Sequence, residues 1–175
     1  MKNLIIVRHG QRDITVSNGV HDGNNLSKFG KKQMKMMAKK IAEKLDDANC
    51  IIFSSDIEYA WDSANILSNE LKCELLQYWR LSRPIDEKNA SIIFEVIKNF
   101  ESVILVTHRE MTADLSSYLV NAIWGFEAFT VIYKDDSILH FFKYYQELNV
   151  GEAYVADYLQ RLFYHLSALK EEKEK

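Results

Sequence analysis

The sequence predicts a three-layer α/β domain, in which helices cover both faces of a mostly parallel central sheet. Short, continuous apolar runs, which are typical of strands buried on both faces, alternate along the chain with amphipathic helical segments. The 175 residues are 47% hydrophobic and 27% charged, which is ordinary for a globular domain. We therefore expect residues 1–175 to form a single domain with a frayed tail at residues 170–175.

Three apolar runs are predicted to be buried strands, and each run ends in polar residues. The runs are Leu4–Val7, Cys50–Phe53 and Val103–Val106. Leu75–Trp79 fits a further strand. Two late segments that flank a polar turn fit a hairpin, namely Phe129–Tyr133 and Ile138–Phe142 around residues 134–137.

Five segments carry apolar residues at the spacing of a helix face. Ser55 and Glu58 have the spacing of a capping box at the second helix, and Asn89 is a candidate cap for the third. The last helix is expected either to pack on the domain or to form a dimer contact. The apolar faces are Met34, Met37, Ala38, Ile41, Ala42 and Leu45; Ile57, Ala60, Trp61, Ala64, Leu67 and Leu71; Ile93, Val96, Ile97 and Phe100; Met111, Leu115, Leu119 and Ala122; and Val155, Tyr158, Leu159, Leu162, Phe163 and Leu166.

Composition and charge exclude several classes of protein. The net charge of -3 argues against general binding of nucleic acid, which usually requires a basic domain. The apolar run at Leu4–Val7 is too short for a signal peptide or a membrane span, so we expect a cytoplasmic protein. Cys50 and Cys73 have no metal-binding spacing and are predicted to be buried free thiols in a reducing compartment.

Polar residues at the ends of two predicted strands indicate an anion site. Arg8, His9 and Gly10 follow the first strand, and His108 follows the strand at Val103–Val106. In open α/β sheets the ligand crevice lies beyond the carboxyl ends of the strands. The sequence therefore predicts that both histidines and an arginine meet at one edge. The long polar loop from this point to Leu26 is of a length that is often functional.

Four segments together resemble the histidine phosphatase superfamily, which includes phosphoglycerate mutases and short phosphohistidine phosphatases. RHG follows the first strand, LSKFGKKQ resembles the Leu-Thr-x-x-Gly-x-x-Gln segment, SSDIEYAWDSANIL resembles Ser-Ser-Pro-Leu-x-Arg-Ala-x-Gln-Thr-Ala, and VTH resembles the strand of the second histidine. Their order and spacing agree over about residues 3 to 122. The resemblance implies a phosphoglycerate mutase-like fold.

The resemblance also implies roles for individual residues. His9 would be the nucleophile and form a phosphohistidine intermediate, while Arg8 and His108 would bind the phosphoryl oxygens. Gly10 would let the backbone approach closely. No metal or organic cofactor is implied. A neutral imidazole is a competent nucleophile, and the planar fork of arginine matches phosphate oxygens.

The sequence departs from the family pattern at the second arginine, where it has Tyr59. A tyrosine hydroxyl can donate a hydrogen bond, but it brings no positive charge near neutral pH, and Tyr59 could also lie only at the pocket rim. Arg12, Arg80, Arg83 and Arg109 are candidate substitutes or ordinary surface arginines. Arg12 and Arg109 are favoured because each lies close in sequence to a site histidine.

The sequence also departs at the general acid. Many family members carry a glutamate after the strand that Leu75–Trp79 would form, but here residues 80–83 contain no carboxylate. Asp86, Glu87 and Glu110 are alternatives, or plain surface charges. Without an acid, poor leaving groups depart slowly. The missing acid therefore points to phosphohistidine proteins or other activated phosphates, and the short segment between Trp79 and Asn89 points to an open site.

Two classes of function follow. The first is a hydrolase: a metal-independent phosphatase that works through His9 on a phosphorylated small molecule or a phosphoprotein, with no nucleic-acid or membrane partner. The second is a catalytically impaired member of the family that acts as a phosphate-binding regulatory protein, as Tyr59 and the missing acid suggest. A mutase is a third, weaker interpretation. The oligomeric state is not predicted.

Overall fold

The computed structural model describes residues 3–13, 15–17, 20–22, 25–45, 50–109, 111, 112, 114–116, 118, 130–132, 138–140, 152–157 and 162–167. Several residues of the sequence-based predictions lie outside this part of the chain. They are Glu110, Leu119, Ala122, Phe129, Tyr133, residues 134–137, Phe142, Tyr158, Leu159 and the tail at 170–175.

A central sheet of eight strands has the order β5-β4-β6-β1-β9-β10-β7-β8. Strands β5, β4, β6 and β1 are mutually parallel, and β9 pairs antiparallel with the other side of β1. Beyond β9, β10 is antiparallel to it and parallel to β7. The strands span Asn3–Arg8 (β1), Cys50–Ser54 (β4), Glu74–Gln77 (β5), Ser102–Thr107 (β6), Thr130–Ile132 (β7), Ile138–His140 (β8), Glu152–Asp157 (β9) and Leu162–Ser167 (β10).

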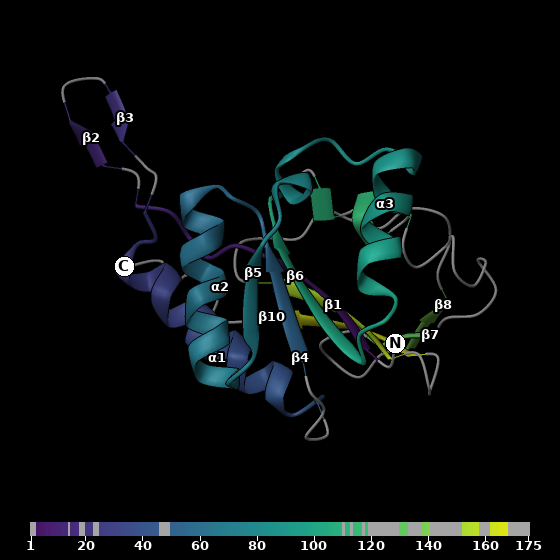
Figure 1. The fold of residues 1–175 in the computed structure, drawn as a ribbon. Helices are drawn as coiled ribbons and strands as arrows, with labels where there is room; N and C mark the ends of the chain where they lie inside the picture. The colour runs from purple at the N-terminus through teal and green to yellow at the C-terminus, as the bar shows by residue number, and fades with distance from the viewer. Residues whose placement is uncertain are drawn as a thin grey trace.

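Helices cover both faces of the parallel part of the sheet, as the sequence predicts (Figure 1). Helices α1 (Lys28–Ala42) and α2 (Glu58–Leu71) pack together on one face, and α3 (Glu87–Ile97) lies on the other. Residues 109, 111, 112, 114–116 and 118 are also helical. The three-layer α/β fold is therefore confirmed.

One apolar core lies on each face of the sheet at β1, because successive side chains of a strand point to opposite faces. Leu4 and Ile6 belong to the core under α3, and Ile5 and Val7 belong to the core under α1 and α2. All four are at most 1% exposed. Strands β4 and β6 alternate in the same way, which explains why their sequences are continuously apolar.

The predicted C-terminal helix is wrong, because its segment forms β9 and β10. Five residues of β9 pair with β1, and β10 pairs with β9 along its whole length. The apolar residues of this segment fit a helical repeat and also an alternating pattern, so periodicity alone does not separate the two. The segment forms strands because β9 pairs with β1. Without this neighbour, the backbone groups on that side of β1 would lack hydrogen bonds.

Both predicted helix caps are also wrong. The residue before helix α2 is Ile57, which makes no side-chain cap because its side chain has no hydrogen-bonding atom, and the Ser55 hydroxyl contacts His108 and the Ile57 nitrogen. Helix α3 begins after Asp86, whose carboxylate accepts a hydrogen bond of 2.7 Å from the backbone nitrogen of Asn89. Asn89 therefore lies within the first turn rather than before it.

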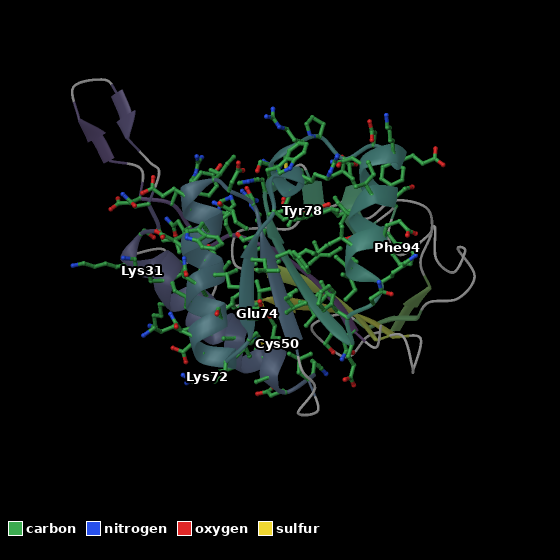
Figure 2. The ribbon with its side chains drawn as sticks, in the orientation of Figure 1. Lys31, Cys50, Lys72, Glu74, Tyr78 and Phe94 are labelled. Carbon is green, nitrogen blue, oxygen red and sulfur yellow. A yellow bond between two sulfur atoms is a disulfide. The ribbon has the colours of Figure 1, made fainter. Side chains whose placement is uncertain are left out.

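The prediction of free thiols is wrong as well, because Cys50 and Cys73 form a disulfide. Parallel pairing of β4 with β5 aligns Ile51 with Glu74, so the preceding cysteines face each other with Cα atoms 5.4 Å apart. Figure 2 places Cys50 and Glu74 at one end of these strands and Tyr78 at the opposite end. The disulfide thus lies at the amino edge of the sheet.

Shorter elements complete the described structure. Leu75–Trp79 divides into β5 and a 3-10 helix η1 at Trp79–Ser82. The loop after Gly10 contains a hairpin of β2 (Thr15–Ser17) and β3 (Val20–Asp22), which stands away from the sheet in Figure 1. The predicted late hairpin is confirmed by β7 and β8. Within the described residues, no helix is long and apolar enough to cross a membrane.

Candidate active site

The carboxyl edge of the sheet brings three separate segments together. Parallel pairing aligns Arg8 with Thr107 and Ser54 with Val106. The residues that follow continue this register, since the His9 backbone nitrogen donates to the Thr107 carbonyl at 3.1 Å and the Ser55 nitrogen donates to the Val106 carbonyl at 3.0 Å. The strand ends therefore place His9, Ser55 and His108 side by side.

Three rings form the centre of this site. The rings of His9 and His108 have centroids 5.6 Å apart, and both residues are buried, with 5% and 4% exposed. The Tyr59 ring, from the first turn of α2, lies 4.4 Å from His9 and 5.2 Å from His108. The two histidines that the sequence predicted at one edge do meet there, and the Tyr59 ring contacts both.

His9 is held as a neutral imidazole with one defined nitrogen. Its Nδ1 lies 2.8 Å from the Gly10 carbonyl oxygen, which can only accept a hydrogen bond, so Nδ1 carries the proton. Burial is the main cause that lowers the pKa of His9 to about 3, with smaller lowering effects from His108, Arg8 and Arg12 and a raising effect from the Gly10 hydrogen bond. Nε2 therefore keeps a lone pair at neutral pH.

Gly10 is positioned by α1 and α2. Its backbone nitrogen donates to the Ser63 hydroxyl at 3.0 Å, and that hydroxyl donates to the Tyr59 carbonyl one turn earlier in α2. A Cβ on Gly10 would lie 2.7 Å from the Gly30 carbonyl oxygen of α1. The close approach of two backbones explains why glycine occurs at both positions.

Arg12 is exposed and contacts the Tyr59 ring. The carbon at the centre of its guanidinium is 4.8 Å from the centroid of the Tyr59 ring, which is a cation–π distance. Arg12 is exposed, and its charge contributes to the lowered pKa of His9. The Arg12 guanidinium, from the loop after β1, thus lies beside Tyr59, the position of α2 at which the family pattern has an arginine.

The structure places the other candidate arginines differently. Arg8 ends β1, is half-buried, and its charge also acts on His9. Arg80 donates to the Asn89 side chain at 3.1 Å and stacks on Trp79, with Arg83 over the same indole. Arg109 is exposed at the residue after His108. Among the substitutes, Arg12 is therefore the one with a described contact to a ring of the site.

Sequence reasoning missed a hydrogen-bonded chain behind His108. The Nε2 atom of His108 lies 2.7 Å from the Ser55 hydroxyl, which lies 3.0 Å from the Ser82 hydroxyl. Ser82 donates in turn to the Asp56 carboxylate. The signal in the sequence was Asp56 itself, because the family segment that it resembles has proline at that position.

The three predicted acids do not form a described contact with the site. Asp86 caps α3, Glu87 is exposed at the first residue of that helix, and Glu110 lies outside the described residues. Among the described residues, no group of three or more His, Cys, Asp or Glu side chains is arranged to hold a metal ion.

Comparison with known protein families identifies the N-terminal part of the chain. Residues 4–82 match the family model described as histidine phosphatase superfamily, branch 1. This segment contains Arg8, His9, Gly10 and Tyr59, and it ends at Ser82. Over residues 4–82 the chain is therefore similar to the histidine phosphatase superfamily. A comparison with curated proteins finds no match to the sequence.

Several solved structures share the fold over nearly the whole chain. A putative phosphohistidine phosphatase SixA from Agrobacterium tumefaciens is 14% identical, with a TM-score of 0.61 over 97% of this chain and 98% of that chain. A putative SixA from Nakamurella multipartitia is 13% identical, with a TM-score of 0.60 over 97% and 95%. A mycobacterial glucosyl-3-phosphoglycerate phosphatase is 14% identical, with a TM-score of 0.55 over 96% and 98%. At these identities, the similarity establishes the phosphoglycerate mutase-like fold.

Proposed function

We propose that this protein is a metal-independent phosphatase that works through a phosphohistidine intermediate at His9. The observation that carries the proposal is the state of His9. Its Nδ1 proton is fixed on the Gly10 carbonyl, and its pKa is lowered to about 3, so Nε2 is available as a nucleophile. The similarity of residues 4–82 to the superfamily and the SixA-like fold support phosphatase activity in general.

The reaction would run in two displacements at phosphorus. The Nε2 lone pair attacks, and the bond from phosphorus to the leaving group breaks with its electron pair on the leaving group. A water oxygen then attacks phosphorus, the P–N bond breaks with its pair returning to Nε2, and dihydrogen phosphate is released. Phosphoryl transfer needs mainly positioning and charge stabilisation, which Arg8, His108 and Arg12 would supply.

The substrate class follows from the leaving group. None of the described contacts places a carboxylic acid beside His9, so a leaving group that needs no added proton is favoured. A phosphorylated imidazole on a protein or another activated phosphate meets this condition better than a sugar phosphate does. Solved relatives of the same fold include both SixA proteins and a glucosyl-3-phosphoglycerate phosphatase, so the fold by itself does not choose between them.

Turnover by purified protein and by His9→Ala tests the proposal. We expect the wild type to hydrolyse p-nitrophenyl phosphate and a phosphohistidine peptide, with the peptide preferred, and the variant to hydrolyse neither. Ser91→Ala, which removes a hydroxyl on the exposed side of α3, is the matched control. Equal rates for wild type and His9→Ala would contradict the assigned nucleophile, and faster turnover of sugar phosphates would contradict the substrate class.

The second candidate function rests on Tyr59. With a tyrosine in place of the second arginine, the site could bind phosphate without turning it over, as a regulatory protein would. Inorganic phosphate or tungstate binding alone does not separate the two functions, because both predict it. Single-turnover trapping does, since only the phosphatase forms an acid-labile, alkali-stable phosphoryl group that is absent from His9→Ala.

A further inference from the structure

A chain of hydrogen bonds runs from the buried His108 to the exposed Asp56. Its members come from three segments: His108 follows β6, Ser55 and Asp56 lie between β4 and α2, and Ser82 ends the 3-10 helix η1. Ser55 is fully buried, Ser82 is half-buried and Asp56 is exposed. We propose that Asp56 and Ser82 are positioning residues that act through Ser55 to fix the proton of His108 on Nε2. This inference rests on the proposed phosphatase site.

The direction of the chain follows from the number of protons each group has. A carboxylate only accepts, so the single hydroxyl proton of Ser82 is used on Asp56. The Ser82 oxygen must then accept from Ser55, which uses the single hydroxyl proton of Ser55. Because Ser55 has no proton left for His108, the hydrogen bond of 2.7 Å between them must be donated by Nε2 of His108.

Ser55 is fully satisfied in this arrangement. A serine hydroxyl can donate one hydrogen bond and accept two. Ser55 donates to Ser82 and accepts from His108 Nε2, and it accepts a second bond of 3.2 Å from the Ile57 backbone nitrogen. If Ser55 donated to His108 instead, no proton would remain between the Ser55 and Ser82 oxygens, because the Ser82 proton is used on Asp56. The direction of the chain is therefore set by the Asp56 carboxylate, which can only accept.

The chain has a chemical consequence at the phosphoryl site. With one proton fixed on Nε2, the ring can donate through Nδ1 only as an imidazolium. Hydrogen bonds that all point toward a carboxylate polarise one another and favour that positively charged form. Asp56 thus stabilises the ring in the state that binds an anion. A proline at this position, as in the family segment that the sequence resembles, could not do so, because it has no carboxylate.

Ser82→Ala tests the direction of the chain without a need for turnover. Two-bond ¹H–¹⁵N spectra report which ring nitrogen carries the proton, with the His108 signals assigned by their loss in His108→Asn. We expect protonated Nε2 in the wild type. In Ser82→Ala the Ser55 hydroxyl no longer donates to Ser82 and can donate to Nε2 of His108. A neutral ring that is protonated only at Nδ1 should therefore become populated. Ser82→Thr should restore the wild-type spectrum, and Ser91→Ala should leave it unchanged.

Kinetics and anion binding provide the second measurement. Ser82→Ala should lower kcat on a phosphohistidine peptide roughly tenfold with KM within a factor of two, and Ser82→Thr should recover it. Asp56→Asn keeps an acceptor oxygen but removes the charge, so it should retain protonated Nε2 and weaken binding of inorganic phosphate about threefold to tenfold.

Two results would overturn the inference: a wild-type His108 whose Nε2 carries no proton, or an unchanged protonation pattern of the ring in Ser82→Ala. Unchanged phosphate affinity in Asp56→Asn would overturn the part assigned to its charge. If no variant turned over any phosphate, the proposed phosphatase function would fail, while the spectra would still decide the direction of the chain. The two failures are therefore distinguishable.

Discussion

Tyr59 is the single residue at which the site departs most from the family pattern. Its ring contacts both histidines and also the Arg12 guanidinium. Stacking on an aromatic face holds a guanidinium in place while leaving its donors available. The positive charge that α2 lacks is thus brought by the loop after β1, which supports the choice of Arg12 as a phosphate-binding residue.

Arg12→Ala should lower kcat/KM on a phosphohistidine peptide by about tenfold to a hundredfold. A donor lost from a water-excluded site typically costs about 10²–10³, and the expected effect is smaller because Arg12 is exposed. Arg12→Lys should recover little, since an ammonium lacks the planar fork. Steady-state kinetics checks this, with Arg83→Ala as a matched control at Trp79. Wild-type kinetics in Arg12→Ala would contradict a role for Arg12 in phosphate binding.

His9 should make the protein sensitive to acid. Its folded-state pKa of about 3 lies below the ordinary 6.5, so between these values the unfolded chain binds one more proton than the folded chain. The free energy of unfolding therefore falls as the pH falls through this window, by up to about 1.4 kcal/mol per pH unit. Urea unfolding at pH 6.5, 5.5 and 4.5 should show a steeper loss in the wild type than in His9→Asn. Parallel losses would show that burial of the neutral ring does not affect stability.

At the scale of elements, the contact between the loop after β1 and α1 sets the position of His9, the proposed nucleophile. Gly10 approaches the Gly30 carbonyl, and a Cβ on Gly30 would collide with the Gln11 carbonyl oxygen. The Gln11 nitrogen donates to the Gln33 side chain of the same helix at 2.9 Å. Helix α1 therefore holds the backbone that carries the hydrogen bond to His9 Nδ1.

Gly30→Ala should destabilise the protein, although alanine favours helix by about 1 kcal/mol over glycine. Overpacking typically costs about 1–3 kcal/mol, so a net loss of roughly 1–2 kcal/mol is expected in urea unfolding, with a several-fold fall in kcat/KM as the loop shifts. Lys35→Ala, on the exposed side of α1, should change stability by less than about 0.5 kcal/mol. A more stable Gly30→Ala variant would show that the loop adapts freely.

At the scale of the whole molecule, the two edges of the sheet have different roles. The carboxyl edge holds His9, Ser55 and His108, and the amino edge holds the Cys50–Cys73 disulfide that joins β4 to β5. The disulfide closes a loop that contains all of α2, with a sequence separation of 23 residues. Its contribution should therefore appear in global stability rather than in the chemistry of the site.

Reduction of the disulfide should lower the free energy of unfolding by about 3 kcal/mol, the loss typical of a loop of this length. Turnover at 25 °C should change little, because the site lies at the opposite edge of the sheet. Urea unfolding with and without dithiothreitol measures this, and a Cys50→Ala/Cys73→Ala variant should be insensitive to the reductant. Two titratable thiols in protein purified under alkylating conditions would favour the free cysteines of the sequence-based prediction, which fit the predicted cytoplasmic location.

Local pattern was enough to predict the layers, the buried strands β1, β4 and β6, and the edge at which the site lies. Burial on both faces makes β1, β4 and β6 continuously apolar, and polar residues mark where each strand ends. His9 and His108 could be placed at one edge because parallel strands share a direction. The family segment around Tyr59 showed which residue of the site was replaced.

The sequence by itself determined the α/β class, the superfamily segment and the two histidines, because these depend on local periodicity and on short motifs. The tertiary structure decided everything that depends on a distant partner. The segment of β9 and β10 is strand because β1 needs a neighbour, Cys50 meets Cys73 because β4 and β5 pair in register, and Arg12 stacks on Tyr59 across 47 residues. The chain of hydrogen bonds from His108 to Asp56 also depends on distant residues. The direction of its hydrogen bonds is defined only when the fold brings the hydroxyl and carboxylate groups together.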